Sequence, residues 1–371
     1  MRTVTIKGLI NFSVLMYFLF MIFTNQIENY VVFVGFYASL LLCGAVVLYA
    51  ADFYLQTRRI MVTLVLIITA AVNAFIVGNA TINEIIFIGL FSWASLALAS
   101  EELEEKTLLI AFGLNAAVVL YKFATVGVVS GQIYTSASRN FVSVYLMYPL
   151  VIYYSIVERK KKDINMLPLV IAWLISLFAQ GRGGIISSTF FLVGVYLVKY
   201  RDMKSRGKII ATVFMLITVA VVMLNIATIF QSIGASSMWE MFARNGMKSS
   251  RTFFWPEYIE LATGNVKNFL FGANVEKTYI GRELDGNPHN SFMELHMLNG
   301  IIGLGLIIII LVKNGIKSIR NRDYLFLVCM LSIVLRAFTD HVLWAAFGTP
   351  VLFYFMFYYD AIQEHGFNYL E

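Results

Sequence analysis

Long apolar runs alternate with short polar breaks along all 371 residues, and this alternation limits the folds that the chain can adopt. A helix crosses a bilayer core of about 30 Å with roughly 20 apolar residues. Hydrophobic residues make up 59% of the chain and charged residues 13%, whereas a soluble domain carries about 25% charged residues. The sequence therefore predicts an all-α, polytopic integral membrane protein.

The length of the apolar runs predicts about 12 transmembrane helices. The expected spans are residues 8–24, 30–51, 60–78, 82–99, 107–129, 139–157, 164–179, 184–199, 208–230, 289–312, 324–341 and 344–359. One long loop, 231–288, separates the ninth and tenth spans, and its segments 238–247 and 251–262 have the apolar spacing of helices. Because no long repeat divides the chain, residues 1–371 are expected to form a single membrane domain.

Lysine and arginine indicate the orientation, because cytoplasmic loops retain them. Basic residues gather near the N-terminus and in alternate breaks, at 58–59, 106, 159–162, 199–208 and 313–322. This bias predicts that both termini are cytoplasmic and that the loop 231–288 is extracytoplasmic. The first apolar run lacks a small-residue cleavage site, so we expect it to remain as a helix.

The net charge of +6 follows from this bias and from attraction to anionic inner-leaflet lipid. It predicts membrane lipid, and no nucleic acid, as a partner. Cys43 and Cys329 lie within spans, where a thiol behaves as a small apolar group, so neither indicates a disulfide or a redox role. No Asp-x-Asp pair occurs in the chain, and we expect no metal and no cofactor.

An arginine flanked by glycines lies between two spans on the predicted outer face, in the segment 180–184. Gly181, Gly183 and Gly184 allow backbone amides to approach a ligand. The planar guanidinium of Arg182 suits a phosphate group. The same pattern also fits an arginine that reaches the membrane interface from a tight turn.

Arg251 stands at the expected start of a loop helix. Free amides and the helix dipole favour an anion at such a position. Two arginines of this kind can neutralise a pyrophosphate without a metal. An ordinary solvated surface arginine is the alternative interpretation.

His289, followed by Asn290, opens a long apolar helix at the membrane boundary. An imidazole with a pKa of about 6.5 can act as a general base near neutral pH. The alternative is a boundary residue that is hydrogen-bonded to lipid headgroups. Gly300, Gly303 and Gly305 in the same run predict close helix packing.

Other polar residues near these segments are candidates for binding or positioning, because charges inside a membrane are costly and often functional. Arg336 and Asp340 are four residues apart on one expected helix, and a structural ion pair is the simpler interpretation. His296 lies two turns beyond His289, on roughly the same expected face. The secondary candidates are Lys122, Gly183, Asn290, Glu294, His296, Arg336, Asp340 and His341.

The order of these features resembles the O-antigen ligase and polymerase superfamily. The resemblance covers 180–311 and rests on the Arg-Gly-Gly turn at 182–184, Arg251 before an aromatic residue and tryptophan, the Phe-Gly-Ala-Asn turn at 271–274, and His289-Asn290 before a Gly-x-x-Gly helix. The remaining residues match only in hydropathy. The turn at 271–274 lacks the second glycine of a Gly-x-Gly pattern, and Ser250 stands where a glycine is expected.

The resemblance implies a glycosyltransferase at the outer face of the cytoplasmic membrane. Its donor would be a glycan on undecaprenyl pyrophosphate, with Arg182 and Arg251 on the pyrophosphate and His289 taking the proton of the attacking sugar hydroxyl. A repeat-unit polymerase for O-antigen, capsule or exopolysaccharide is expected ahead of a ligase, because the chain and its outer loop are short. The implied partners are the lipid-linked donor and acceptor, a chain-length regulator and a flippase.

A lipid-linked oligosaccharide flippase or a secondary transporter is the alternative from another class, since twelve spans also suit it. Such proteins bind their substrate near the bilayer midplane, with broken helices and polar groups there. In this chain the mid-span positions are mostly Leu, Ile, Val and Phe, and polar residues gather at the predicted outer edge. A structural or sensory protein would not require the outer Arg182, Arg251 and His289.

Overall fold

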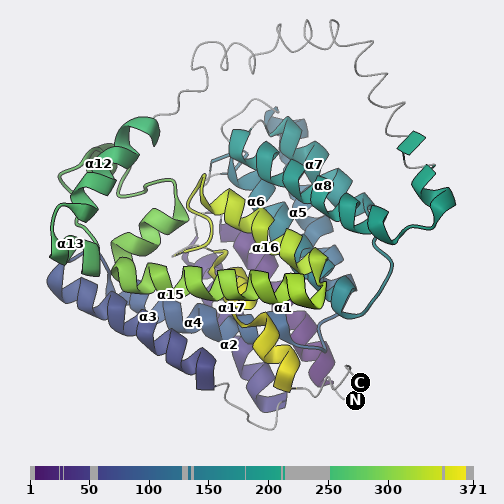
Figure 1. Ribbon diagram of the computed structural model, residues 1–371, viewed down its shortest axis with the longest axis horizontal. Helices are drawn as coiled ribbons and strands as arrows, with labels where there is room; N and C mark the ends of the chain where they lie inside the picture. Colours follow the sequence, from purple (N-terminus) through teal and green to yellow (C-terminus); the bar gives the residue numbers. More distant parts are fainter. Residues whose placement is uncertain are drawn as a thin grey trace, which may run out of the picture.

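The computed structural model describes residues 5–24, 26–27, 29–50, 57–127, 133–134, 138–179, 181–209, 212–213, 251–344 and 347–364. The long elements within these ranges are all α-helices (Figure 1). They are α1 Ile6–Thr24, α2 Tyr30–Ala50, α3 Thr57–Ile76, α4 Ile82–Ala99, α5 Glu105–Val126, α6 Phe141–Arg159, α7 Leu167–Phe178, α8 Arg182–Asp202, α12 Arg251–Thr263, α13 Val266–Phe271, α14 Tyr279–Glu283, α15 Ser291–Asn321, α16 Tyr324–Ala337 and α17 Thr349–Glu364.

Eight of the described helices, α1 to α6, α8 and α15, are long and apolar enough to cross a membrane. This confirms a polytopic, all-helical membrane protein. The runs expected to span at 164–179, 324–341 and 344–359 form the shorter helices α7, α16 and α17, of 12, 14 and 16 residues. The span expected at 208–230 and the helix expected at 238–247 lie outside the described residues, so the number twelve stays a prediction.

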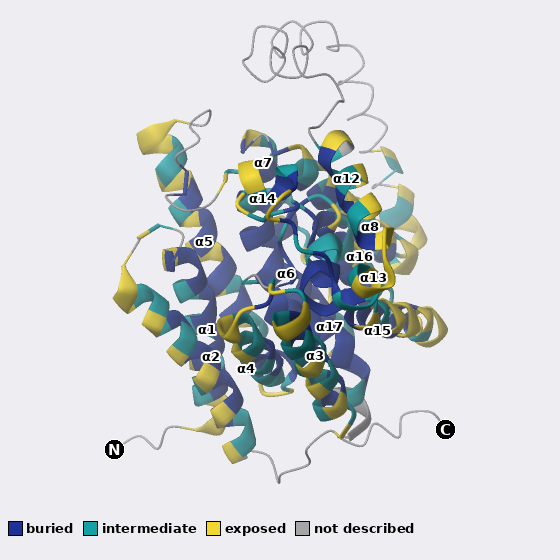
Figure 2. Ribbon diagram, turned by 90° about the vertical axis from the view of Figure 1, so that its left-hand side faces the viewer, coloured by how far each residue is buried: buried dark blue, intermediate teal, exposed yellow. Residues whose placement is uncertain are grey.

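Helix α6 lies at the centre of the bundle, and 89% of the residues in its apolar stretch are buried. It packs against α5, α7, α8 and α16, while α17 packs against α4 and α15. Buried residues fill the interior and exposed ones line the outside (Figure 2). Large apolar side chains such as Phe75 and Met61 are exposed on that outer surface. An apolar outside around a packed inside is the arrangement that a helical bundle adopts in lipid.

The polar connections between helices separate into two ends of the bundle. At one end, Arg58 pairs with Asp360 at 2.6 Å and Lys162 pairs with Glu105 at 2.9 Å. We call this the terminal end, because α1 begins there and α17 ends there (Figure 2). At the opposite end, which we call the site end, Arg336 of α16 donates to the Asn140 carbonyl that precedes α6.

Helices α12 to α14 form a small layer at the site end. Phe254, Tyr258 and Ile280 are buried in its own apolar core together with Met297 of α15. The Trp255 indole N–H donates to the Pro288 carbonyl at 3.0 Å, which joins α12 to the segment before α15. The segment 251–262, expected to be helical from its apolar spacing, lies within α12.

Helix α15 is broken at Gly300, which has φ 61° and ψ −170°. A Cβ at this position would collide with the backbone of Leu270 in α13, so glycine permits the two segments to cross closely. Asn73 of α3 fixes the crossing, because its amide donates to Met297 O at 2.8 Å and also to Phe271 O. Close packing at Gly300 was expected from the sequence, whereas the break in the helix was not.

The two neighbouring glycines differ from each other. Gly303 faces Leu66 of α3, with 3.5 Å between a Cβ placed on the glycine and Leu66 Cδ2. Gly305 faces open space, so its assignment to close packing was wrong. Positions two residues apart on a helix point about 200° apart, so the two glycines cannot face the same neighbour.

Candidate functional site

His289 lies just before α15 in a left-handed conformation, with φ 49°. Its backbone N–H donates to Asn287 Oδ1 at 2.8 Å, which stabilises this turn. Asn290 is the N-cap of α15, and its Oδ1 accepts from the amides of Phe292 at 2.9 Å and Met293 at 3.2 Å. The side chain of Asn290 is therefore used for helix capping, and the cap fixes where His289 stands.

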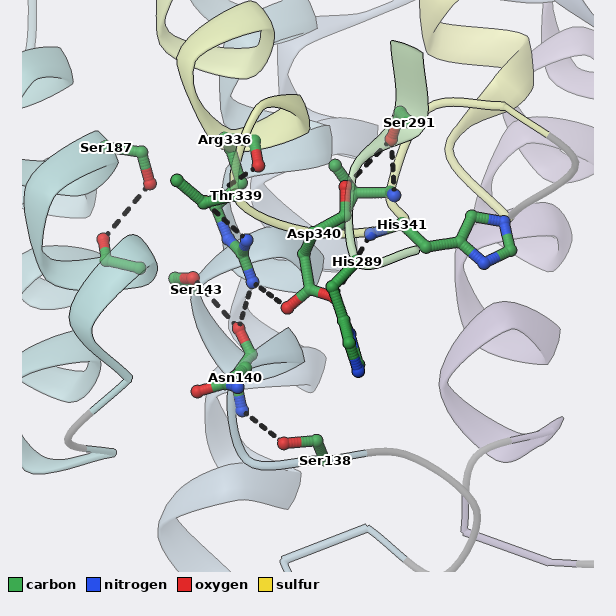
Figure 3. A network of polar contacts seen from close by, with 12 residues as sticks. Ser138, Asn140, Ser143, Ser187, His289, Ser291, Arg336, Thr339, Asp340 and His341 are labelled. Carbon is green, nitrogen blue, oxygen red and sulfur yellow. Dashed lines mark hydrogen bonds and ion pairs between the residues drawn. The ribbon is translucent and has the colours of Figure 1, made fainter. Parts of the chain in front are cut away.

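Asp340 lies between His289 and Arg336 (Figure 3). His289 Nδ1 is 3.2 Å from Asp340 Oδ1, and Arg336 Nη2 is 3.0 Å from Asp340 Oδ2. The exposed fractions of the three side chains are 37% for His289, 2% for Asp340 and 0% for Arg336. The buried ion pair therefore supports an imidazole that reaches solvent.

Arg336 makes further hydrogen bonds at the end of α16. Nη1 donates to Thr339 Oγ1 at 2.9 Å, and Nη2 donates to the Asn140 carbonyl at 2.9 Å (Figure 3). A buried charge of this kind is tolerated when a counter-charge and hydrogen bonds satisfy it. The ion pair expected from the spacing of Arg336 and Asp340 is present, and it extends to His289, which the spacing does not predict.

The pKa of Asp340 is lowered by its surroundings. Burial alone would raise this pKa, but the hydrogen bond from His289 and the charge of Arg336 outweigh burial. Asp340 is therefore ionised, and a carboxylate facing Nδ1 keeps the proton on that nitrogen. The other nitrogen of His289, Nε2, is then the one able to accept a proton.

Ser291 holds the chain around Asp340 in place, although no sequence pattern singled it out. Its hydroxyl donates to the Asp340 carbonyl at 2.9 Å (Figure 3) and accepts from the amides of Val342 at 2.8 Å and Leu343 at 3.1 Å. This serine connects the first turn of α15 to the 338–344 segment. It fixes the two segments that carry His289 and Asp340.

Arg251, the first residue of α12, shares the electrostatic environment of this site. Burial lowers its pKa, the charge of Asp340 raises it, and the charges of Arg336 and Arg182 lower it further. Arg182 is the exposed first residue of α8, directly after the N-cap Gly181. Asp340, Arg336 and Arg182 thus all contribute to the electrostatic environment of Arg251.

Gly183 has a packing role that brings α8 to the site. A Cβ at this position would lie 3.0 Å from Thr339 Cβ and 3.4 Å from Arg336 Nη1. Gly181 likewise meets Asn140, with 3.2 Å between its added Cβ and Asn140 Cα. Gly183 thus gives α8 close contact with the segment that carries Arg336, and Gly181 gives it close contact with Asn140. That these glycines also give a ligand access to the backbone stays a prediction.

His296 has its own partners away from His289. Its Nδ1 lies 2.6 Å from the Tyr258 hydroxyl, and its Nε2 lies 3.1 Å from the Phe269 carbonyl. The carbonyl can only accept, so Nε2 carries the proton and Nδ1 accepts from Tyr258. The expected alignment of His296 with His289 was wrong, because His289 precedes the helix and its positive φ interrupts the helical spacing.

Glu294 and His341 form a second imidazole and carboxylate pair beside the first. His341 Nε2 is 3.0 Å from Glu294 Oε2. The hydrogen bond of His341 Nε2 is made to the Trp344 carbonyl oxygen, at 2.7 Å. The backbone N–H of His341 donates to Asp340 Oδ1 at 3.1 Å. Lys122 is half-buried near the end of α5, and no polar contact within the described ranges joins it to these candidates.

Taken together, the site end offers one imidazole with an ionised partner, and that carboxylate also pairs with Arg336 and acts on the charge of Arg251. Such a set can remove a proton from a hydroxyl and stabilise negative charge on a neighbouring phosphate. The sequence matches no protein-family model, and no curated protein is similar to it.

Proposed function

We propose that the protein is a polysaccharide repeat-unit polymerase that uses undecaprenyl-pyrophosphate-linked oligosaccharides as donor and acceptor. The contact of His289 with Asp340, at 3.2 Å and within the charge environment of Arg251, Arg182 and Arg336, carries this proposal. The site lies at one end of an apolar bundle, where a lipid-linked substrate can present its headgroup. The enzyme class is a membrane glycosyltransferase.

The arginines act on the leaving group in this proposal. When the donor sugar leaves, the bond between its anomeric carbon and the pyrophosphate oxygen breaks, and negative charge builds on the diphosphate. Arg251 and Arg182 stabilise that charge, because guanidinium groups bind phosphate oxygens in pairs. Donors placed in advance at a developing charge supply a large part of many rate enhancements.

His289 acts on the acceptor. The acceptor hydroxyl attacks the anomeric carbon, and its proton passes to His289 Nε2 as the new glycosidic bond forms. Asp340 orients the imidazole and stabilises the imidazolium that results, as a carboxylate does in other histidine-base sites. Arg336 keeps Asp340 ionised without itself touching the substrate.

The proposal includes an orientation, with the site on the outer face of the cytoplasmic membrane and both termini in the cytoplasm. The basic residues at the terminal end, among them Arg58, Arg159 and Lys161, support it. The exposed positions Glu276 at the site end and Lys161 at the terminal end provide the test. In intact cells a membrane-impermeant maleimide should label Glu276→Cys and leave Lys161→Cys unlabelled; the reverse pattern would contradict the orientation.

The polymerase reaction is tested with purified protein in proteoliposomes and lipid-linked repeat units, without nucleotide sugar and without an ion gradient. We expect a ladder of longer lipid-linked glycans, and no ladder from His289→Ala. A ligase would transfer glycan to a different acceptor without lengthening the chain. In cells, loss of a polymerase leaves single repeat units attached, whereas loss of a ligase leaves long chains unattached.

A flippase or transporter is the second candidate, because the break at Gly300 in α15 is a feature of transporter helices. The polar groups at the break are engaged within the protein, however. Met297 O accepts from Asn73 at 2.8 Å and from Asn79 at 3.1 Å, and Asn299 Oδ1 accepts from the Trp344 indole at 3.1 Å. Movement of lipid-linked units across proteoliposomes without new glycosidic bonds would favour this candidate.

A further inference from the structure

We propose that the outer face of α15 at the terminal end binds an anionic phospholipid, a site independent of the polymerase proposal. A groove of about 640 Å³ runs along this face. Its lining includes the apolar residues Ile309, Val312 and Ile316 and the basic residues Lys313, Lys317 and Arg320. The proposed ligand is a phospholipid with an acidic headgroup, such as phosphatidylglycerol.

The length of the groove matches one leaflet of a bilayer. From Ile309 to Arg320 an α-helix rises roughly 16 Å, about half of a 30 Å hydrocarbon core. Ile309 and Val312 come first along the helix, Lys313 and Ile316 follow, and Lys317 and Arg320 lie nearest its end. An acyl chain lying beside Ile309 and Val312 therefore brings its headgroup to the cations.

The apolar side chains of the groove are exposed on the outside of the bundle. Ile309 is 67% exposed, Val312 55% and Ile316 47%. No other helix among the described residues covers these side chains, and we infer that they face lipid in a membrane. A chain held there contacts apolar side chains at every turn.

The three cations share one face, because Lys317 is four residues after Lys313 and Arg320 is three residues further on. Lys317 Nζ lies 4.6 Å from the centre of the Tyr359 ring, which limits its movement. Asp360, whose charge reaches Lys317, is itself paired with Arg58 at 2.6 Å. Like charges at helical spacing repel each other, and an anionic headgroup relieves that repulsion.

Native mass spectrometry of the full-length protein provides the test, with phosphatidylglycerol and phosphatidylcholine as probes. Each cation near a membrane surface contributes roughly fivefold to the affinity for anionic lipid. The triple variant Lys313→Gln, Lys317→Gln, Arg320→Gln should therefore lose its preference for phosphatidylglycerol by about a hundredfold. The matched control removes three charges at the same end, with Lys204→Gln, Arg206→Gln and Lys208→Gln, and should keep the preference.

Other outcomes overturn the site. Equal loss in the matched control would mean a diffuse basic surface, and a retained preference in the triple variant would exclude this face. Displacement of the lipid by soluble glycerol phosphate would mean that the headgroup alone is bound and that the apolar groove has no part. If the triple variant does not fold, the exposed single change Lys313→Gln should still weaken phosphatidylglycerol binding about fivefold, while glycan transfer remains as in the unchanged protein.

Discussion

Asp340→Asn is the most informative single change, because Asp340 joins the proposed base His289 to the buried Arg336. The amide keeps the shape of the side chain and removes its charge. The substitution therefore has two distinct effects, one on catalysis and one on stability. The catalytic effect acts through His289, and the structural effect acts through Arg336.

The catalytic effect can be worked from the distance between His289 and Asp340. Charges 3.2 Å apart interact with about 5 kcal/mol at an effective dielectric constant of about 20, and with about 1 kcal/mol in water. His289 is 37% exposed, so we take the lower part of this range, about 2 kcal/mol. Loss of that stabilisation of the imidazolium in the transition state slows transfer about thirtyfold.

The structural effect comes from the charge that is left behind. Arg336 is fully buried, and removal of one partner of a buried ion pair costs about 3–5 kcal/mol. Thr339 and Asn140 still accept hydrogen bonds from Arg336, so we expect the low end, about 3 kcal/mol. Thermal unfolding in detergent measures this loss.

A double variant separates the two effects. Arg336→Met with Asp340→Leu replaces both charges by apolar groups and should recover most of the stability, but not the rate. The matched control Asp323→Asn makes the same chemical change at the terminal end, where Asp323 accepts from the Tyr359 hydroxyl at 2.8 Å, and should keep normal transfer. The reasoning is refuted if Asp340→Asn transfers glycan at the normal rate, or if the double variant regains rate together with stability.

Four other changes test the site. Arg182→Lys should greatly reduce the polymer ladder, because an ammonium cannot form the paired contacts of a guanidinium, and a normal ladder would remove Arg182 from the site. Arg251→Ala should raise the donor concentration needed for half-maximal transfer while the protein still inserts into the membrane, and His289→Ala should abolish transfer while lipid-linked donor still binds. Because the pKa of folded Asp340 is lowered, the difference in melting temperature between the unchanged protein and Asp340→Asn should shrink as the pH falls below about 4, the unfolded pKa, and be lost as the pH passes the folded pKa. Tyr258→Phe should lower stability by about 1–2 kcal/mol by removing the bond to His296, with transfer nearly unchanged.

Hydropathy predicted the first six helices to within a few residues, because polar breaks end both a membrane span and an α-helix at the same place. It was less informative for α16 and α17, which are too short to span a bilayer on their own. The residues from Val351 to Tyr359 in α17 are all nearly inaccessible, so they are apolar because they face protein. Hydropathy cannot distinguish an apolar residue that faces lipid from one that faces the interior.

The sequence predicted one contact of the candidate site and missed the others. Helical spacing gave the pair of Arg336 with Asp340, since both lie within five residues of one another. The partner of Asp340 on the other side, His289, is 51 residues away, and no local pattern reports such a contact. Ser291 was missed for the same reason, since its three hydrogen bonds all reach the 338–344 segment.

The charges of the site explain why one aspartate belongs among three arginines. Arg182, Arg251 and Arg336 carry three positive charges, and Asp340 removes one of them, which leaves an excess equal to one charge for each phosphate of a diphosphate. Asp340 also reduces the repulsion within the set, because its charge raises the pKa of Arg251 while the other arginines lower it. A second acidic group would leave an excess of one positive charge and weaken the attraction for the donor. Without Asp340, the buried Arg336 would lose its counter-charge and His289 its orienting group, so the same carboxylate serves packing, electrostatics and the proposed chemistry.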